Sequence, residues 1–210
     1  LHQAVYNDQA EVVRTLLAAS KAQLNAPNDA GETPLLVACG RGNLHIARML
    51  LDAGADANRP LTNGTTPLHW AAQAGNRFLV EALLGAGAAI DARNGVGETP
   101  LLMAARAGNN EVVRLLVEHR ADVNAADNLQ HTALYYAGER GFTEIVELLL
   151  AAGAVLKLTV GSLLSSMGMK PNFIIAMYCL AIILTRPKVG QALIIGLLAG
   201  LICQVPMLNA

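Results

Sequence analysis

Five histidines are the residues of this chain best suited to bind a metal or to transfer protons near neutral pH. They are His2, His45, His69, His119 and His131. None has a second histidine or a cysteine at the short spacings from which zinc sites are built. The spacing therefore argues against a metal site and favours structural or surface roles for these side chains.

The patterns expected of a catalytic site or a phosphate-binding loop are not found either. Asp56, Asp91 and Asp122 stand in loops, where aspartate commonly caps turns. Ser165-Ser166 has no base nearby in the sequence, and Gly95-Val96-Gly97 does not continue into a phosphate-binding motif. We therefore expect a protein that is not an enzyme and needs no cofactor.

The positions that must hold any functional surface are set by a motif that recurs every 33 residues. Its copies are Thr33-Pro34-Leu35, Thr66-Pro67-Leu68, Thr99-Pro100-Leu101 and Thr132-Ala133-Leu134. Glycines and leucine pairs recur with it: Gly42, Gly75, Gly108 and Gly141, then Leu50-Leu51, Leu83-Leu84, Leu115-Leu116 and Leu148-Leu149. A strict period of this length indicates a solenoid of stacked helical units.

This pattern resembles the ankyrin-repeat family, in which each unit is a β-turn followed by two antiparallel helices. The resemblance covers residues 1–154, as a partial first repeat that starts at Leu1-His2-Gln3-Ala4 and four fuller repeats. It implies an all-α ankyrin-repeat solenoid with β-turn tips. We expect apolar helices to follow it at residues 155–210.

Each recurring residue has a physical role in such a unit. A threonine can cap a helix N-terminus, and the proline after it lacks an N–H that would be unpaired there anyway. The glycine after each first helix suits a left-handed C-cap. His69 resembles the family's structural link between a helix and a loop, and Tyr135 replaces it in the last repeat. Gln130 replaces the turn glycine, which predicts strain in that turn.

The resemblance implies that partners bind to the turn tips and to the concave face formed by the first helices. The tips are Asp29, Ala30 and Glu32; Thr62, Asn63 and Thr65; Gly95, Val96 and Glu98; and Asn128, Leu129 and His131. The residues that we expect to contact a partner are Arg41, Asn63, Trp70, Gln73, Val96, Arg106, Leu129, Tyr136, Glu139 and Arg140. Their charges are mixed in sign, which favours a protein partner and argues against a nucleic acid.

One column of large side chains has two interpretations. Val37, Trp70, Met103 and Tyr136 occupy the same position in successive repeats. We expect them to pack between repeats, and the alternative is that they contact a partner as hot spots. Trp70 and Tyr136 are the two that mutation should test first.

Composition changes abruptly near the end of the repeats. Residues 1–147 contain 16 acidic and 11 basic residues, for a net charge of −5, whereas the rest of the chain carries four basic residues and no acidic one. The three cysteines, Cys39, Cys179 and Cys203, are far apart and odd in number. This argues against a disulfide framework and favours a reducing compartment.

Residues 155–210 contain two apolar runs, at 172–185 and 189–207, separated by Arg186-Pro187-Lys188. The second run is of roughly the length that a membrane-spanning helix needs, and the first is short for a span unless it begins near Met167. Neither has the polar stripe of a soluble helix. We expect insertion into a lipid bilayer with the repeats on the cytoplasmic side. If residues 155–167 also cross or dip outward, the next run returns and the basic break lies on the cytoplasmic side, as the positive-inside rule favours; with only the two runs spanning, the break would lie outside. The alternative is a cytoplasmic protein in which the two runs form a packed helical hairpin.

The C-terminal segment that contains Met169-Lys170-Pro171 resembles part of a tryptophan-transport-type substrate-binding component of energy-coupling-factor transporters. The match covers the last 45 to 50 residues, and the family's later helices are missing. The junction therefore resembles a fusion of two fragments. The leading hypothesis is a membrane-tethered ankyrin adaptor, and the alternative is a fragment of a transport component with an ankyrin appendage.

Overall fold

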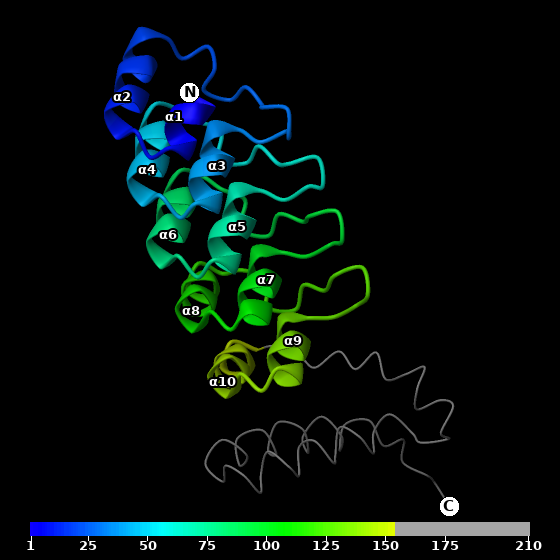
Figure 1. Ribbon diagram of the computed structural model, residues 1–210. Helices are drawn as coiled ribbons and strands as arrows, with labels where there is room; N and C mark the ends of the chain where they lie inside the picture. Colours follow the sequence, from blue (N-terminus) through cyan, green and yellow to red (C-terminus); the bar gives the residue numbers. More distant parts are fainter. Residues whose placement is uncertain (154–210) are drawn as a thin grey trace, which may run out of the picture. The chain divides into compact units, whose positions relative to one another are not determined.

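The computed structural model describes residues 1–153, and these residues form ten α-helices arranged in pairs (Figure 1). The helices are α1 (His2–Tyr6), α2 (Ala10–Ala19), α3 (Pro34–Gly40), α4 (Leu44–Asp52), α5 (Pro67–Gln73), α6 (Arg77–Gly85), α7 (Pro100–Ala107), α8 (Asn110–Glu118), α9 (Ala133–Glu139) and α10 (Thr143–Ala151). This part of the chain has no strand, and its one isolated β-bridge joins Ala126 to Thr132. The prediction of an all-α fold is confirmed for these residues.

The helices form two layers. The odd-numbered helices contact one another along the stack, from α1 to α9, and each contacts the even-numbered helix of its own repeat. The long loops extend from the layer of odd-numbered helices, on the side away from the even-numbered ones (Figure 1). The first helices and the loop tips of successive repeats are therefore neighbours on one side of the stack.

The threonine caps form as predicted. The side-chain oxygens of Thr33, Thr99 and Thr132 accept hydrogen bonds from backbone amides three residues later, at 3.2, 3.4 and 3.3 Å. Proline occupies the first turn of α3, α5 and α7. These caps fix where each first helix begins.

Asparagines link the second helices to the preceding repeat, which the sequence analysis did not predict. Asn43 and Asn76 cap α4 and α6 by accepting hydrogen bonds from amides at 3.0 and 3.1 Å. Asn109 instead donates from Nδ2 to the carbonyls of Ala72 and Gln73, at 2.8 Å each. The Nδ2 atom of Asn76 likewise donates to the carbonyl of Gly42 at 3.3 Å. These donated bonds cross the boundary between repeats and satisfy carbonyls at or just after the ends of the preceding first helices.

One leucine of each recurring pair is fully buried between the layers. Leu50, Leu83, Leu116 and Leu149 are each 0% exposed. Small residues such as Ala71, Ala72, Ala104 and Ala105 are also fully buried in the first helices, where they let neighbouring helices approach closely. The core is thus built from aliphatic side chains at seams between helices.

Cys39 is a free, buried cysteine in α3. Burial raises the pKa of its thiol to about 12, because the charged thiolate is disfavoured away from water. The thiol is therefore protonated at neutral pH.

The turn glycines have left-handed conformations, and Gln130 takes the same conformation in the last repeat. Gly31, Gly64 and Gly97 have φ values of 79°, 79° and 81° at the turn position that Gln130 occupies in the last repeat. Gln130 has a φ of 65°, where a side chain is sterically disfavoured. Arg120 also has a φ of 65°, which the sequence analysis did not predict.

Replacing Gln130 by glycine is expected to raise the free energy of unfolding by up to about 1 kcal/mol, because it relieves the left-handed strain at a small entropic cost. Denaturant unfolding followed by circular dichroism measures the change. Gln130→Ala keeps the Cβ atom and is the control, for which we expect no gain. Equal stability of the glycine and alanine variants would show that the turn is not strained.

Within residues 1–153, no helix is long and apolar enough to cross a membrane. The apolar helices expected at 155–210, Cys179 and Cys203 lie outside the described residues, as does the predicted domain boundary between residues 154 and 155.

Candidate functional site

Most of the residues expected to contact a partner are accessible to solvent. Trp70, Val96 and Leu129 are 37%, 58% and 70% exposed. Five others are also exposed: Arg41, Asn63, Gln73, Glu139 and Arg140. Arg106 and Tyr136 are half-buried. All ten belong to a first helix, to the residue that ends it, or to a loop tip, and we call them the first-helix face.

The column of large side chains divides into two groups. Val37 and Met103 are 7% and 6% exposed, so the expected packing between repeats is confirmed for them. Trp70 lies at the same position in its repeat but is 37% exposed, so it is less covered than Val37 and Met103. Its side chain is larger than those of Val37 and Met103, and Trp70 therefore remains accessible to a partner.

His69 joins two neighbouring repeats from a fully buried position. Its Nδ1 accepts a hydrogen bond from the amide of Thr66 at 3.2 Å and lies 2.8 Å from the Thr66 hydroxyl oxygen. Its Nε2 lies 2.9 Å from the carbonyl oxygen of Glu98, to which it therefore donates. Burial lowers the pKa of His69, so the ring is neutral at neutral pH. The predicted structural link between a helix and a loop is present in this geometry.

His2 makes a similar contact in the first repeat, which the sequence analysis missed. Its Nε2 lies 3.0 Å from the carbonyl oxygen of Glu32, as that of His69 lies near the carbonyl of Glu98. The signal was present in the sequence, because Leu1-His2-Gln3-Ala4 aligns with Leu68-His69-Trp70-Ala71.

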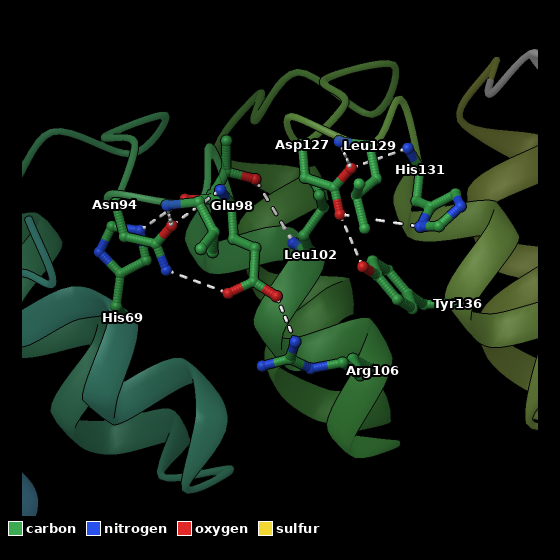
Figure 2. Close-up of polar contacts among 11 residues, drawn as sticks. His69, Asn94, Glu98, Leu102, Arg106, Asp127, Leu129, His131 and Tyr136 are labelled. Atoms are coloured by element: carbon green, nitrogen blue, oxygen red, sulfur yellow. Dashed lines mark hydrogen bonds and ion pairs between the residues drawn. The ribbon is translucent and has the colours of Figure 1, made fainter. Parts of the chain in front are cut away.

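Glu98 and Thr65 were expected at the tips but are buried, at 4% and 6% exposure. The Oε2 atom of Glu98 accepts a hydrogen bond from Nδ2 of Asn94 at 3.0 Å, and Oε1 forms an ion pair with Nη1 of Arg106 (Figure 2). A carboxylate can be buried here because both of its oxygens are paired. The contact also fixes the direction of Arg106, which is part of the first-helix face.

Asp127 is a second buried carboxylate, at 4% exposure, in the turn of the next repeat. Its Oδ1 accepts hydrogen bonds from the amides of Leu129 and His131, both at 2.9 Å, and Oδ2 accepts one from the Tyr136 hydroxyl at 2.6 Å (Figure 2). Burial, followed by this bond to Asp127, raises the pKa of the Tyr136 hydroxyl above its ordinary value. Tyr136 is thereby held in one orientation.

Arg106 and Tyr136 also lie close to each other across the boundary between two repeats. The guanidinium carbon of Arg106 is 5.8 Å from the centre of the Tyr136 ring, within the range of a cation–π contact. Each side chain is anchored by a buried carboxylate. These two members of the first-helix face are therefore preorganised before any partner binds.

Tyr135 does not form the link that His69 forms in its own repeat. Its ring is 39% exposed and stacks on His131, with 4.0 Å between the ring centres. His131, expected as a surface residue, is partly buried by this contact. His45 and His119 are exposed, as expected.

The described part of the chain has no group of three or more His, Cys, Asp or Glu side chains placed to hold a metal ion. Its buried carboxylates are bound by amides, an asparagine, an arginine and a tyrosine, as described above for Glu98 and Asp127. The arrangement presents fixed side chains at a surface, and that is suited to recognition.

Comparison with known proteins agrees with the period and the geometry. A family model described as ankyrin repeats (3 copies) matches residues 1–94 and 76–159. No curated protein matches the chain.

Proposed function

The chain belongs to the ankyrin-repeat family, and we propose that it binds another protein through its first-helix face. Ankyrin repeats are protein-interaction modules, and this face contains exposed side chains from four successive repeats. The observation that carries the proposal is the anchoring of Arg106 and Tyr136 by the buried carboxylates of Glu98 and Asp127. Fixed, partly exposed Arg and Tyr side chains are typical of binding hot spots.

Capture of partners on immobilised full-length chain tests the proposal. A variant with Trp70→Ala and Arg140→Ala is expected to lose the proteins that the wild type retains. The control is Phe78→Ala with Arg48→Ala, which removes one exposed aromatic and one exposed arginine from α6 and α4. Equal loss with both variants, or retention with both, would contradict binding at the first-helix face.

We further propose that residues 155–210 anchor the protein to a lipid bilayer, with the repeats in the cytoplasm. The support is the sequence alone: two apolar runs with a basic break between them, and this break lies on the side of the repeats if residues 155–167 cross or dip outward before the first run. A bilayer covers such surfaces and leaves their backbone groups bonded within each helix. This tether fits an adaptor, whereas solute uptake into vesicles that contain the chain would favour the transport component instead.

Alkaline carbonate washing of membranes tests the tether. The full chain is expected to stay in the membrane pellet and to be released by detergent. Recovery of the chain as a soluble monomer without detergent would contradict the proposal and favour the packed hairpin.

A further inference from the structure

The two helix layers differ in charge. The even-numbered helices carry seven acidic side chains and four arginines: Glu11, Asp52, Glu81, Glu111, Glu118, Glu144 and Glu147, with Arg14, Arg48, Arg77 and Arg114. The odd-numbered helices, with the residues that cap their C-termini, carry three arginines and one glutamate: Arg41, Arg106, Arg140 and Glu139. The layer beside the loops is thus the basic one in a repeat region of negative net charge.

Arg41 and Arg140 form no ion pair with any residue that the structure describes, and both are exposed. The guanidinium of Arg41 lies over the Tyr6 ring, 4.4 Å from its centre, which orients the arginine but leaves its charge unpaired. Arg77, on α6, in contrast contacts carboxylates of Glu81 and Glu111 at 3.0 and 3.3 Å.

Residues 148–210 supply no carboxylate side chain to these arginines. No aspartate or glutamate follows Glu147 in the sequence. Arg106 already has its counter-ion, because Glu98 is buried against it. Within the first-helix face, the unpaired positive charges are therefore those of Arg41 and Arg140. The neighbouring Glu139 is the one acidic residue of the face.

In the repeats between these two arginines, Arg106 is the one charged member of the face, and Glu98 neutralises it. Trp70 is 37% exposed on α5, and Val96 and Leu129 are 58% and 70% exposed at neighbouring tips. These tips lie beside each other, because the amide of Asn128 donates to the carbonyl of Val96 at 3.0 Å. The surface thus combines cations near its ends with apolar contact area between them.

We propose that the first-helix face binds a protein segment that carries acidic side chains together with aromatic or aliphatic ones. Carboxylates of the segment pair with Arg41 and Arg140, and its apolar side chains pack on Trp70 and the tips. Arginine binds carboxylates through two parallel hydrogen bonds, which gives direction as well as attraction. This inference rests on the proposed function and specifies the chemistry of the partner.

Selection of displayed random peptides on the immobilised full-length chain, in mild detergent, tests the inference. We expect enrichment of peptides with several Asp or Glu residues and at least one aromatic or aliphatic residue. Synthetic versions of these peptides are then titrated against the chain. The emission of Trp70, the single tryptophan of the sequence, reports their binding.

Charge reversal provides the matched comparison. The double variant Arg41→Glu with Arg140→Glu is expected to weaken binding of these peptides by about tenfold or more, since it turns attraction into repulsion. Arg48→Glu with Arg114→Glu makes the same change in net charge on exposed residues of α4 and α8 and is expected to leave affinity within about threefold. Arg41→Gln with Arg140→Gln only neutralises the charges, and its affinity for the peptides is expected to lie between those of the two charge reversals.

Three outcomes would overturn the inference: enrichment of basic or uncharged peptides, no enrichment at all, or equal weakening by both charge reversals. The proposed function would survive each of them if full-length partners are still captured by the wild type and lost with Trp70→Ala and Arg140→Ala. The two proposals can therefore fail separately. If Arg41→Glu with Arg140→Glu melts at a lower temperature than the wild type, the affinity of Arg41→Gln with Arg140→Gln for the peptides tests the inference instead.

Discussion

Replacing Leu116 by alanine is expected to lower the free energy of unfolding of the repeats by about 2–5 kcal/mol, the usual cost of a cavity in a packed core. Leu116 is fully buried in α8 and occupies the same position as Leu50, Leu83 and Leu149 in the other repeats. A repeat unit cannot bury its own apolar face, so contacts at this seam hold the stack together. Leu83→Ala is expected to have a similar effect.

Urea unfolding followed by far-ultraviolet circular dichroism measures this change. Leu129→Ala is the matched control, because Leu129 is 70% exposed at a loop tip and its truncation leaves no cavity. We expect the control to change stability by less than about 0.5 kcal/mol. A loss equally small for Leu116→Ala would mean that the seam is not packed as described.

Replacing His69 by alanine is expected to cost at least about 2 kcal/mol, because it leaves two buried polar groups without their partner. The amide of Thr66 loses its acceptor at 3.2 Å, and the carbonyl of Glu98 loses its donor at 2.9 Å. Both groups belong to buried residues, so water cannot readily replace the imidazole. The hydrogen bond to Glu98 joins two repeats, so its loss also weakens the contact between them.

The dependence of stability on pH provides an independent test of His69. Its pKa is lowered from 6.5 in the folded state, so the unfolded chain takes up a proton first as the pH falls. The contribution of His69 is therefore fully present above pH 6.5 and is lost as the pH falls from 6.5 toward the folded pKa, with a slope of up to about 1.4 kcal/mol per pH unit.

The difference between wild type and His69→Ala isolates this term, because the other histidines are common to both proteins. His45→Ala, at an exposed position of α4, controls for the loss of one imidazole from the chain. Parallel pH profiles for wild type and His69→Ala would show that His69 is not buried in its neutral form.

The parts of the fold that depend on local chemistry could be predicted from the sequence. A threonine cap, a proline in the first turn and a left-handed glycine each need only a few neighbouring residues. Thr33 and Gly108 therefore have the roles predicted for them. The left-handed φ of Gln130 was predictable for the same reason, since it follows from the glycines at equivalent positions.

The parts that depend on side-chain contacts between separate elements, within a repeat or between repeats, could not be predicted in this way. Glu98 and Asp127 are charged residues in turns, which usually means exposure, yet each is buried because a partner from the following helix covers it. The hydrogen bonds from Asn109 to carbonyls of the preceding first helix also join two repeats. Trp70 and Met103 occupy the same position of their repeats but are 37% and 6% exposed. The repeat period alone does not predict this difference in burial.

The polar links between repeats have a consequence for how this protein can change over generations. The contacts of His2, His69 and Asn109 each join one repeat to the next. A substitution at the exposed surface of one repeat therefore disturbs at most its two neighbours. Selection can alter the recognition surface one unit at a time while the frame of histidines, asparagines and leucines stays unchanged, so new specificities are reachable through series of folded intermediates.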